Sequence, residues 1–255
     1  MSEAKVVLVP GAWMGGWVWK PAAEQLLSRG IDAEIITLHG LRRGESSADI
    51  AAVRLEDHIQ QLVEHVQSQN ARPVIFVSHS YSGMVTASAA DRIEAQVLGL
   101  IHLGAFLPKS GRSLLDDWGG SDKQRAQERA DIEAADGLWL PPTREMLDYE
   151  PDLTADDRDF LAAHFTAHPG RTITDHAQLS APVAVQPSTF VAFTPAGTFE
   201  DAWNNAPPVA AAASRWRRKH LVSGHWPMVS NLDATVNLLE AEIRHYIRTG
   251  AESWR

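Results

Sequence analysis

The stretch Val77-Ser78-His79-Ser80-Tyr81-Ser82-Gly83 (VSHSYSG) joins two patterns and decides which fold the chain can adopt. Residues 73–77 before it read PVIFV and predict a fully buried strand, and apolar positions recur at helical spacing in residues 84–93 after it. Ser80 therefore falls at the apex of a sharp strand-to-helix turn. A nucleophile in such a turn stands above the sheet with its backbone strained toward positive φ, and the positions two before and two after it must be small.

Serine fills both of these small positions, at Ser78 and Ser82. The usual pattern, G-x-S-x-G, has glycine there, so the match is in side-chain size and not in the literal motif. The helix that follows directs its N-terminal dipole and free N–H groups at Ser80, which favours developing negative charge. The alternative role for Ser80 is that of a simple N-cap residue.

Apolar strands and helical patterns alternate on both sides of this turn. Such alternation predicts an α/β protein with a mainly parallel, doubly wound sheet that helices cover on both faces. Ligands of such sheets bind at the carboxyl ends of the strands. The predicted strands are residues 5–9, 33–37, 73–77, 97–103, 189–194 and 220–222.

The alternation stops after Pro108. Residues 109–170 hold 7 Lys and Arg against 14 Asp and Glu, in polar helical pieces that are typical of a solvated face. Within them GLWLPP at 137–142 is too apolar for a free surface loop. We therefore predict an α/β core of residues 1–108 and 188–255 and a helical cap of residues 109–187, acidic outside and apolar inside.

The composition is that of an ordinary globular protein of 255 residues, and it excludes several classes of function. A net charge of -9 argues against a nucleic-acid partner, and the absence of cysteine excludes disulfides and a cysteine nucleophile. No apolar run is long enough to span a membrane and no signal-peptide pattern is present, so we expect a cytoplasmic protein with no membrane partner. Neither a metal-ligand cluster nor a phosphate loop appears, so no metal or cofactor is expected. The choice between a monomer and a homodimer stays open.

A serine hydroxyl needs a base to take its proton, and His225 is the best placed of eleven histidines. It follows the last predicted strand directly, which puts it at the same sheet edge as Ser80, and in this architecture the base comes last in the chain. We expect His79 to point away from Ser80, and His102, inside a strand, to be a core histidine.

Four segments carry a family resemblance over nearly the whole chain: VLVPGAWMGGWVWKPAAEQLLSRG (7–30), VSHSYSGMVTASAADR (77–92), HLGAFLPKSGRSLLD (102–116) and SGHWPMVSNLDATVNLL (223–239). Together they resemble the α/β-hydrolases, and within these the plant hydroxynitrile lyase and methyl-ester esterase group with its bacterial esterase relatives. The resemblance implies Ser80 as nucleophile, His225 as base, and an oxyanion hole from the N–H groups of Ala12 and Tyr81. The physical reading agrees for the loop after the first strand, whose backbone N–H groups can face a tetrahedral intermediate.

Two positions distinguish activities within that group. The hydroxynitrile lyases resembled here carry lysine directly after the catalytic histidine and threonine at the place of Gly11, whereas this chain has Trp226 and Gly11. A departing cyanide would lack its cationic partner, so ester hydrolysis is favoured.

The third member of a Ser-His-acid triad is absent from its expected place. The resemblance implies an aspartate about three residues beyond the strand that ends at Thr194, but residues 195–197 are Pro-Ala-Gly, and the alternative position holds Gly104. Glu200 and Asp201 are the nearest replacements, and each could equally be a solvated carboxylate at a helix start. A displaced acid and no acid at all stay open.

Trp13 and Met14 near the oxyanion loop, with Trp139 in the cap, predict an apolar substrate pocket. The sequence therefore predicts a carboxylesterase or lactonase that acts on a small hydrophobic or aromatic ester through an acyl-enzyme. Two alternatives stay open. One is a cofactor-free lyase or dioxygenase in which His225 abstracts a proton, and the other is a non-catalytic protein that binds a small ligand.

Overall fold

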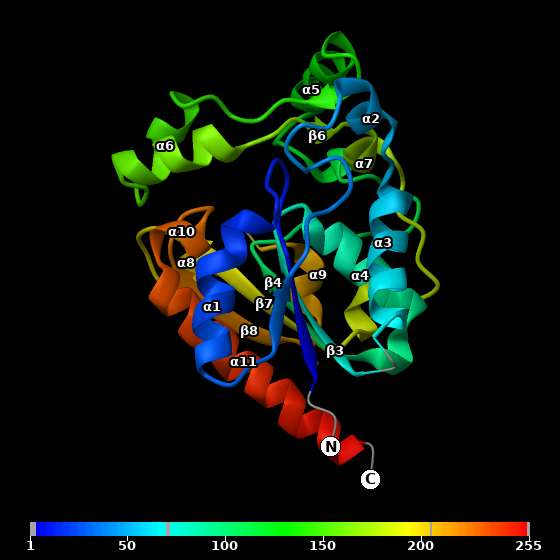
Figure 1. Ribbon diagram of the computed structural model, residues 1–255, viewed down its shortest axis with the longest axis vertical. Helices are drawn as coiled ribbons and strands as arrows, with labels where there is room; N and C mark the ends of the chain where they lie inside the picture. Colours follow the sequence, from blue (N-terminus) through cyan, green and yellow to red (C-terminus); the bar gives the residue numbers. More distant parts are fainter. Residues whose placement is uncertain (1–3, 70–71, 205, 254–255) are drawn as a thin grey trace.

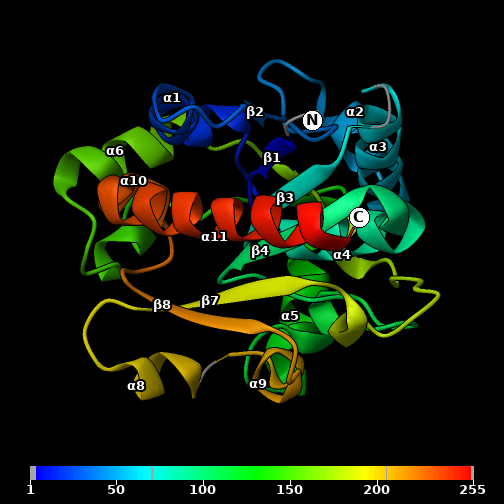
Figure 2. The ribbon, with the colours of Figure 1, turned by 90° about the horizontal axis from the view of Figure 1, so that it is seen from below.

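A six-stranded parallel sheet runs through the molecule (Figure 1) in the order β2-β1-β3-β4-β7-β8, which can be followed from top to bottom in Figure 2. The computed structural model describes residues 4–69, 72–204 and 206–253. All six predicted strands are present, which confirms the parallel α/β sheet expected from the alternation. They are β1 (Lys5–Val9), β2 (Ala33–Ile35), β3 (Val74–His79), β4 (Val97–Leu103), β7 (Ser188–Thr194) and β8 (Arg217–Val222).

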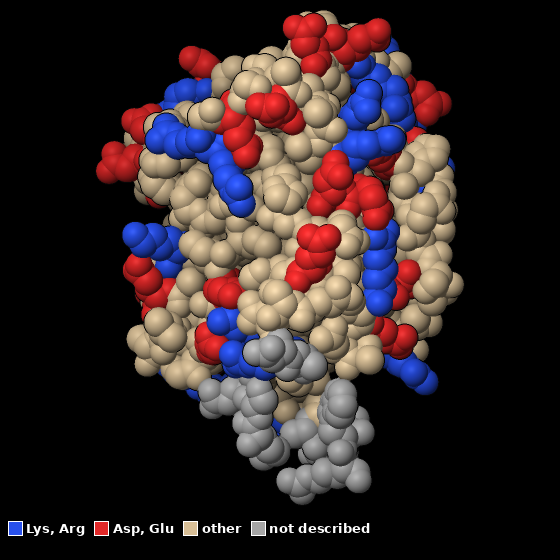
Figure 3. Space-filling view, turned by 45° about the vertical axis from the view of Figure 1, so that its right-hand side comes forward, with Lys and Arg blue, Asp and Glu red and all other residues tan. Residues whose placement is uncertain are grey.

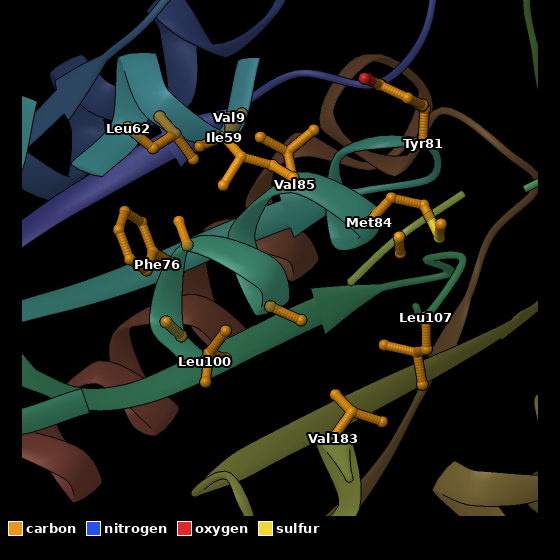
Figure 4. Packing of buried hydrophobic residues seen from close by; sticks show 14 of the residues in the cluster. Val9, Ile59, Leu62, Phe76, Tyr81, Met84, Val85, Leu100, Leu107 and Val183 are labelled. Atoms are coloured by element: carbon orange, nitrogen blue, oxygen red, sulfur yellow. The ribbon is translucent and has the colours of Figure 1, made fainter. Parts of the chain in front are cut away.

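Helices cover both faces of the sheet because successive strand residues point to opposite sides. Val6 and Leu8 of β1 pack on the side of α1 (Lys20–Ser28) and α11 (Leu232–Ser253), and Figure 2 shows α11 lying along that side. Val7 and Val9 pack on the opposite side of the sheet, which a second group of helices covers. Figure 4 shows Val9 and Phe76 of this side in the same cluster as Ile59 and Val85. The helices of the second side are α3 (Leu55–Gln67), α4 (Ser82–Arg92), α8 (Phe199–Trp203) and α9 (Pro208–Ala212).

The chain between β4 and β7 forms a cap over the carboxyl ends of the strands, drawn in green at the top of Figure 1. It carries α5 (Asp122–Ala134), α6 (Ala155–His164) and α7 (Arg171–Thr174). It also contains an antiparallel ladder of β5 (Leu138–Trp139) and β6 (His168–Pro169), which the sequence did not indicate. The remaining elements are α2 (Ser47–Ala52), α10 (Pro227–Ser230) and the 3-10 turns Gly16–Trp19, Glu94–Gln96, Leu115–Asp117, Met146–Tyr149 and Val183–Val185.

One face of the molecule carries charges of both signs. On the face in Figure 3, acidic and basic side chains lie among one another, with a group of basic side chains at the upper right. Within the described ranges, no helix is both long and apolar enough to cross a membrane. The same residues contain no group of three or more His, Cys, Asp and Glu side chains that could hold a metal ion.

Candidate active site

Ser80 sits directly after β3 with φ of 52°, in the left-handed region that non-glycine residues rarely occupy. Three backbone hydrogen bonds hold it there. Its N–H donates to the Leu103 carbonyl (3.2 Å), and its carbonyl accepts from the N–H groups of Gly83 (3.3 Å) and Phe106 (3.0 Å). The end of β4 and the loop after it therefore maintain the strained turn that the sequence predicted. The side chain is 8% exposed at the apex of that turn.

The two neighbouring serines are fully buried and have structural partners. The Ser78 hydroxyl forms a 2.7 Å hydrogen bond with Nδ1 of His102, so His102 is the core histidine that was expected. The Ser82 hydroxyl accepts from the His79 N–H (2.9 Å) and lies 2.9 Å from the Val9 carbonyl, to which it can donate. Ser80 is therefore the serine of this stretch whose hydroxyl has no partner among the described residues.

His225 lies beside the turn, in the loop after β8. Its ring centroid is 4.8 Å from that of His79, the residue before Ser80, and Nε2 of His79 donates to the His225 carbonyl (2.7 Å). His79 thus turns away from the nucleophile, as predicted, and fastens the loop of the proposed base. No hydrogen bond joins the Ser80 hydroxyl to the His225 ring within the described part of the chain.

The protonation state of His225 follows from its surroundings. The side chain is partly exposed yet densely surrounded by protein. Burial lowers the pKa of His225 to about 4, while the nearby Asp152 carboxylate acts in the opposite direction and raises it. The ring is therefore neutral at neutral pH, which is the form that accepts a proton.

The oxyanion loop after β1 is tied to the cap. Trp13 has φ of 64°, and its backbone N–H donates to Nδ1 of His168 (3.3 Å) while its carbonyl accepts from the Thr166 N–H (3.0 Å). Its indole N–H donates to the Trp139 carbonyl (3.0 Å). These bonds fix the conformation of the loop next to Ala12, which is buried and whose backbone N–H has no partner among the described residues.

Tyr81, the second residue expected to contribute an oxyanion N–H, is fixed by a buried hydrogen-bond chain. Nε2 of His58 donates to the His39 carbonyl (2.7 Å), so Nδ1 of His58 accepts from the Tyr81 hydroxyl (2.7 Å). Burial lowers the pKa of His58 to about 4 and raises the pKa of Tyr81. Both groups therefore stay neutral and keep these donor and acceptor roles.

The carboxylates predicted as replacement acids do not meet His225. Glu200 and Asp201 are exposed in the first turn of α8. The Asp201 carboxylate accepts from the Thr198 N–H (2.7 Å) and hydroxyl (2.9 Å). Among the described residues, neither carboxylate forms a hydrogen bond or ion pair with His225. Asp201 thus has the helix-start role that the sequence left open as its alternative.

Two cap carboxylates that the sequence did not single out lie against the His225 loop instead. Oδ2 of Asp152 accepts from the Gly224 N–H (2.6 Å), and the Glu150 carboxylate accepts from the His225 backbone N–H. Oδ2 of Asp152 also accepts from the hydroxyls of Ser230 (2.6 Å) and Ser223 (3.1 Å). No local signal separates these residues from the many solvated acidic residues of the cap.

The predicted apolar pocket is present in part. Trp13 and Trp139, whose rings lie 4.2 Å apart, line a cavity of about 520 Å³ in the cap together with Trp118 and Leu138. Met14 does not line it, because its side chain is 1% exposed and packs in the core on the side of α1 and α11. The prediction for Met14 is therefore wrong, since its apolar character serves the core.

Comparison with known proteins agrees with this geometry. The sequence pattern of the Alpha/beta hydrolase family matches residues 6–238. The chain belongs to this family. The fold of the hydrolase also matches that of an extracellular α/β-hydrolase from a Paenibacillus species, with a TM-score of 0.77 and 14% identity over 92% of this chain and 98% of that chain.

Two similar proteins of this hydrolase family are esterases by name. The carbendazim hydrolyzing esterase of Nocardioides sp. (strain SG-4G) is 38% identical over 113 residues, which are 44% of this chain and 46% of that protein. Methylesterase 2 of Arabidopsis thaliana is 31% identical over 121 residues, which are 44% of this chain and 45% of that protein. The chain thus matches about half the length of these relatives. They confirm the resemblance to the methylesterase group.

Proposed function

We propose that the protein is a serine carboxylesterase or lactonase that works through an acyl-enzyme. The observation that carries the proposal is Ser80 itself, held at φ of 52° at the apex of the turn while the hydroxyls of Ser78 and Ser82 are occupied elsewhere. The packing of His225 against His79 supports it, because this brings the base to the residue next to the nucleophile. The esterase names of the relatives support it as well.

Each group has a defined part in this reaction. His225 takes the Ser80 hydroxyl proton as Oγ attacks the ester carbonyl, and the N–H groups of Ala12 and Tyr81 stabilise the resulting oxyanion. The tetrahedral intermediate collapses, the ester C–O bond breaks, and the alkoxide leaves with the proton from His225. Water then attacks the acyl-enzyme by the same route, which releases the acid and restores the Ser80 hydroxyl.

A cavity in the cap supports a preference in substrate class. Trp13 of the oxyanion loop lines it together with Trp118 and Trp139, and the lining also contains two acidic side chains, Glu128 and Asp131. Aromatic walls favour an apolar acyl or alcohol group, and the carboxylates disfavour an anionic one. We therefore expect neutral hydrophobic or aromatic esters to be better substrates than short anionic esters.

Hydrolysis of aryl esters with an increasing acyl length tests the proposal. Ser80→Ala should abolish turnover, whereas Ser78→Ala should keep substantial activity, because only Ser80 stands at the apex. kcat/KM should rise with the size of the hydrophobic acyl group. Inactivity of the parental enzyme on every ester, or activity that survives in Ser80→Ala, would sink the proposal.

A second candidate is a non-hydrolytic enzyme in which His225 abstracts a substrate proton and Ser80 only hydrogen-bonds. The missing bond between the Ser80 hydroxyl and the His225 ring favours it. A hydroxynitrile lyase is the less suitable version, because a Cβ at Gly11 would lie 2.7 Å from Nδ1 of His79, so the threonine of those lyases does not fit here without a shift. A burst of product from an activated acetate ester would support the hydrolase over this candidate.

A further inference from the structure

The loop directly after β7 lacks the carboxylate that a Ser-His-acid triad requires. We propose that a cap residue, Asp152, takes this role: it is the positioning residue that orients His225 and stabilises its protonated form. This inference rests on the proposed function, in which His225 is the base. The sequence separation of 72 residues between Asp152 and its partner Gly224 shows that the cap and the core must pack together to build this arrangement.

The first support is geometric. The two oxygens of the Asp152 carboxylate have different surroundings. Oδ2 accepts three hydrogen bonds from the loop after β8 and from α10, which fix the position of the group. Oδ1 is buried and has no hydrogen-bond partner among the residues that the structure describes. A buried, unpaired carboxylate oxygen costs free energy, so it indicates an acceptor for a donor that binds at another stage.

The second support is the close approach of this oxygen to the loop of the base. A Cβ added at Gly224 would lie 2.2 Å from Oδ1 of Asp152, which explains why glycine precedes His225. The free oxygen therefore lies against the residue next to the imidazole. In this proposal a ring N–H of His225 donates to this oxygen when the other ring nitrogen takes the Ser80 proton.

The third support is charge. Burial alone would raise the pKa of Asp152, but the hydrogen bonds from Ser230 and Gly224 hold it below its ordinary value, so the carboxylate is negative at neutral pH. Burial raises the pKa of its neighbour Glu150. Asp152 is also the carboxylate whose charge raises the pKa of His225. It therefore stabilises the imidazolium that forms during the reaction.

The alternative is that Asp152 only fastens the loop, and the test must separate the two roles. Asp152→Asn keeps the shape of the side chain and removes the charge. We expect a loss in kcat of about 10²- to 10⁴-fold. The acid limb of the kcat/KM profile should also move to lower pH by about one unit or more, because the imidazole loses the charge that raised its pKa.

Matched variants supply the controls. Ser230→Ala removes one hydrogen bond to the same carboxylate but leaves its charge, so it should leave the acid limb in place. Asp201→Asn and Glu200→Gln should keep parental kcat. The other titratable groups that face His225 are His79 at the end of β3 and Glu150 in the cap. Glu150→Gln therefore separates the effect of a second nearby carboxylate from that of Asp152.

Two outcomes would overturn the inference. One is an Asp152→Asn enzyme with parental kcat, and the other is a loss of activity with an unmoved acid limb that Ser230→Ala reproduces. The His225 pKa measured by NMR in the parental and Asp152→Asn proteins gives the same answer without turnover. The proposed function fails separately, if the parental protein hydrolyses no ester and a serine-directed phosphonate does not label it.

Discussion

The turn around Ser80 tolerates serine at the two positions where glycine is usual, because its steric limit lies at another residue, Gly83. Ser78 and Ser82 fit because each hydroxyl finds a buried partner. At Gly83, by contrast, a Cβ would lie 2.2 Å from the Phe106 carbonyl and 2.7 Å from Cβ of Ala105. The steric demand of the turn thus falls on the glycine three residues after Ser80.

Gly83→Ala should therefore destabilise the protein by about 3 kcal/mol, because the backbone after β4 must move to make room. The same shift should disturb Ser80, whose carbonyl accepts from the Phe106 N–H. Urea unfolding measures the change in the free energy of unfolding. Gly120→Ala is the control, since its Cβ would meet only a flexible side-chain oxygen at 3.5 Å, and it should change stability by no more than about 0.5 kcal/mol. Equal stabilities of the two variants would contradict this account of the turn.

The sequence predicts individual site residues when they are fixed by local pattern. Ser80 directly follows the buried strand β3 and His225 lies three residues after the end of β8, and a strand end specifies where the next side chains lie. Asp152 has no such marker, because its role depends on how a cap loop packs against Gly224. Met14 was assigned to the pocket on its apolar character alone, which does not distinguish a core residue from a lining residue.

The oxyanion loop shows what the cap does at the scale of structural elements. Thr172 donates its hydroxyl proton to the Pro169 carbonyl (2.7 Å), so Nε2 of His168 must donate to the Thr172 oxygen (2.9 Å). Nδ1 of His168 is then free to accept from the Trp13 N–H. Strand β6 therefore holds the loop after β1 in the strained conformation that presents Ala12.

His168→Ala should lower kcat by about 10- to 100-fold with a smaller effect on KM, because the oxyanion N–H groups lose their fixed positions. Thr166→Ala is the matched control. Thr166 supports the same loop through its backbone N–H (3.0 Å), which alanine retains, and loses only the long contact of its hydroxyl with the Trp13 carbonyl (3.5 Å), so this variant should keep nearly parental kcat. The measurement is steady-state kinetics on one aryl ester. If the two variants had equal kcat values, the cap would not position this loop through His168.

Strands of five or more mostly apolar residues in total length are predictable, whereas very short ones are not. The strands β1, β3, β4 and β7 were found from their apolar runs, which fill both packed faces of the sheet. The β5–β6 ladder has two residues in each strand, too few to show any period. Its position depends on the contact between two cap segments about thirty residues apart, which the local sequence does not encode.

Buried histidines make the stability of the whole molecule depend on pH. Burial lowers the pKa of five of them below the ordinary 6.5, to about 4 for His58 and about 3 for His102. The folded state therefore binds fewer protons than the unfolded state below pH 6.5, so the free energy of unfolding must fall as the pH decreases from 6.5 toward those values. The five are His58, His79, His102, His168 and His225.

Stability measured by urea unfolding should thus be nearly constant above pH 7 and markedly lower at pH 5. The expected loss is on the order of 1–2 kcal/mol for each fully buried histidine. His102→Asn should make the loss of unfolding free energy between pH 7 and pH 5 smaller by the contribution of His102, whatever the effect of the substitution on stability at pH 7.5. A stability that is flat or increases between pH 7 and pH 5 would show that these rings are not buried in their neutral form.

The most direct test of the central claim, that Ser80 is an activated nucleophile, is mass spectrometry after incubation with a serine-directed phosphonate. The account predicts one phosphonyl group per protein, mapped to Ser80, with a rate that falls strongly in Asp152→Asn. Ser78→Ala should still be labelled and Ser80→Ala should not. Labelling at any other serine, or an unlabelled protein that still hydrolyses esters, would contradict the account.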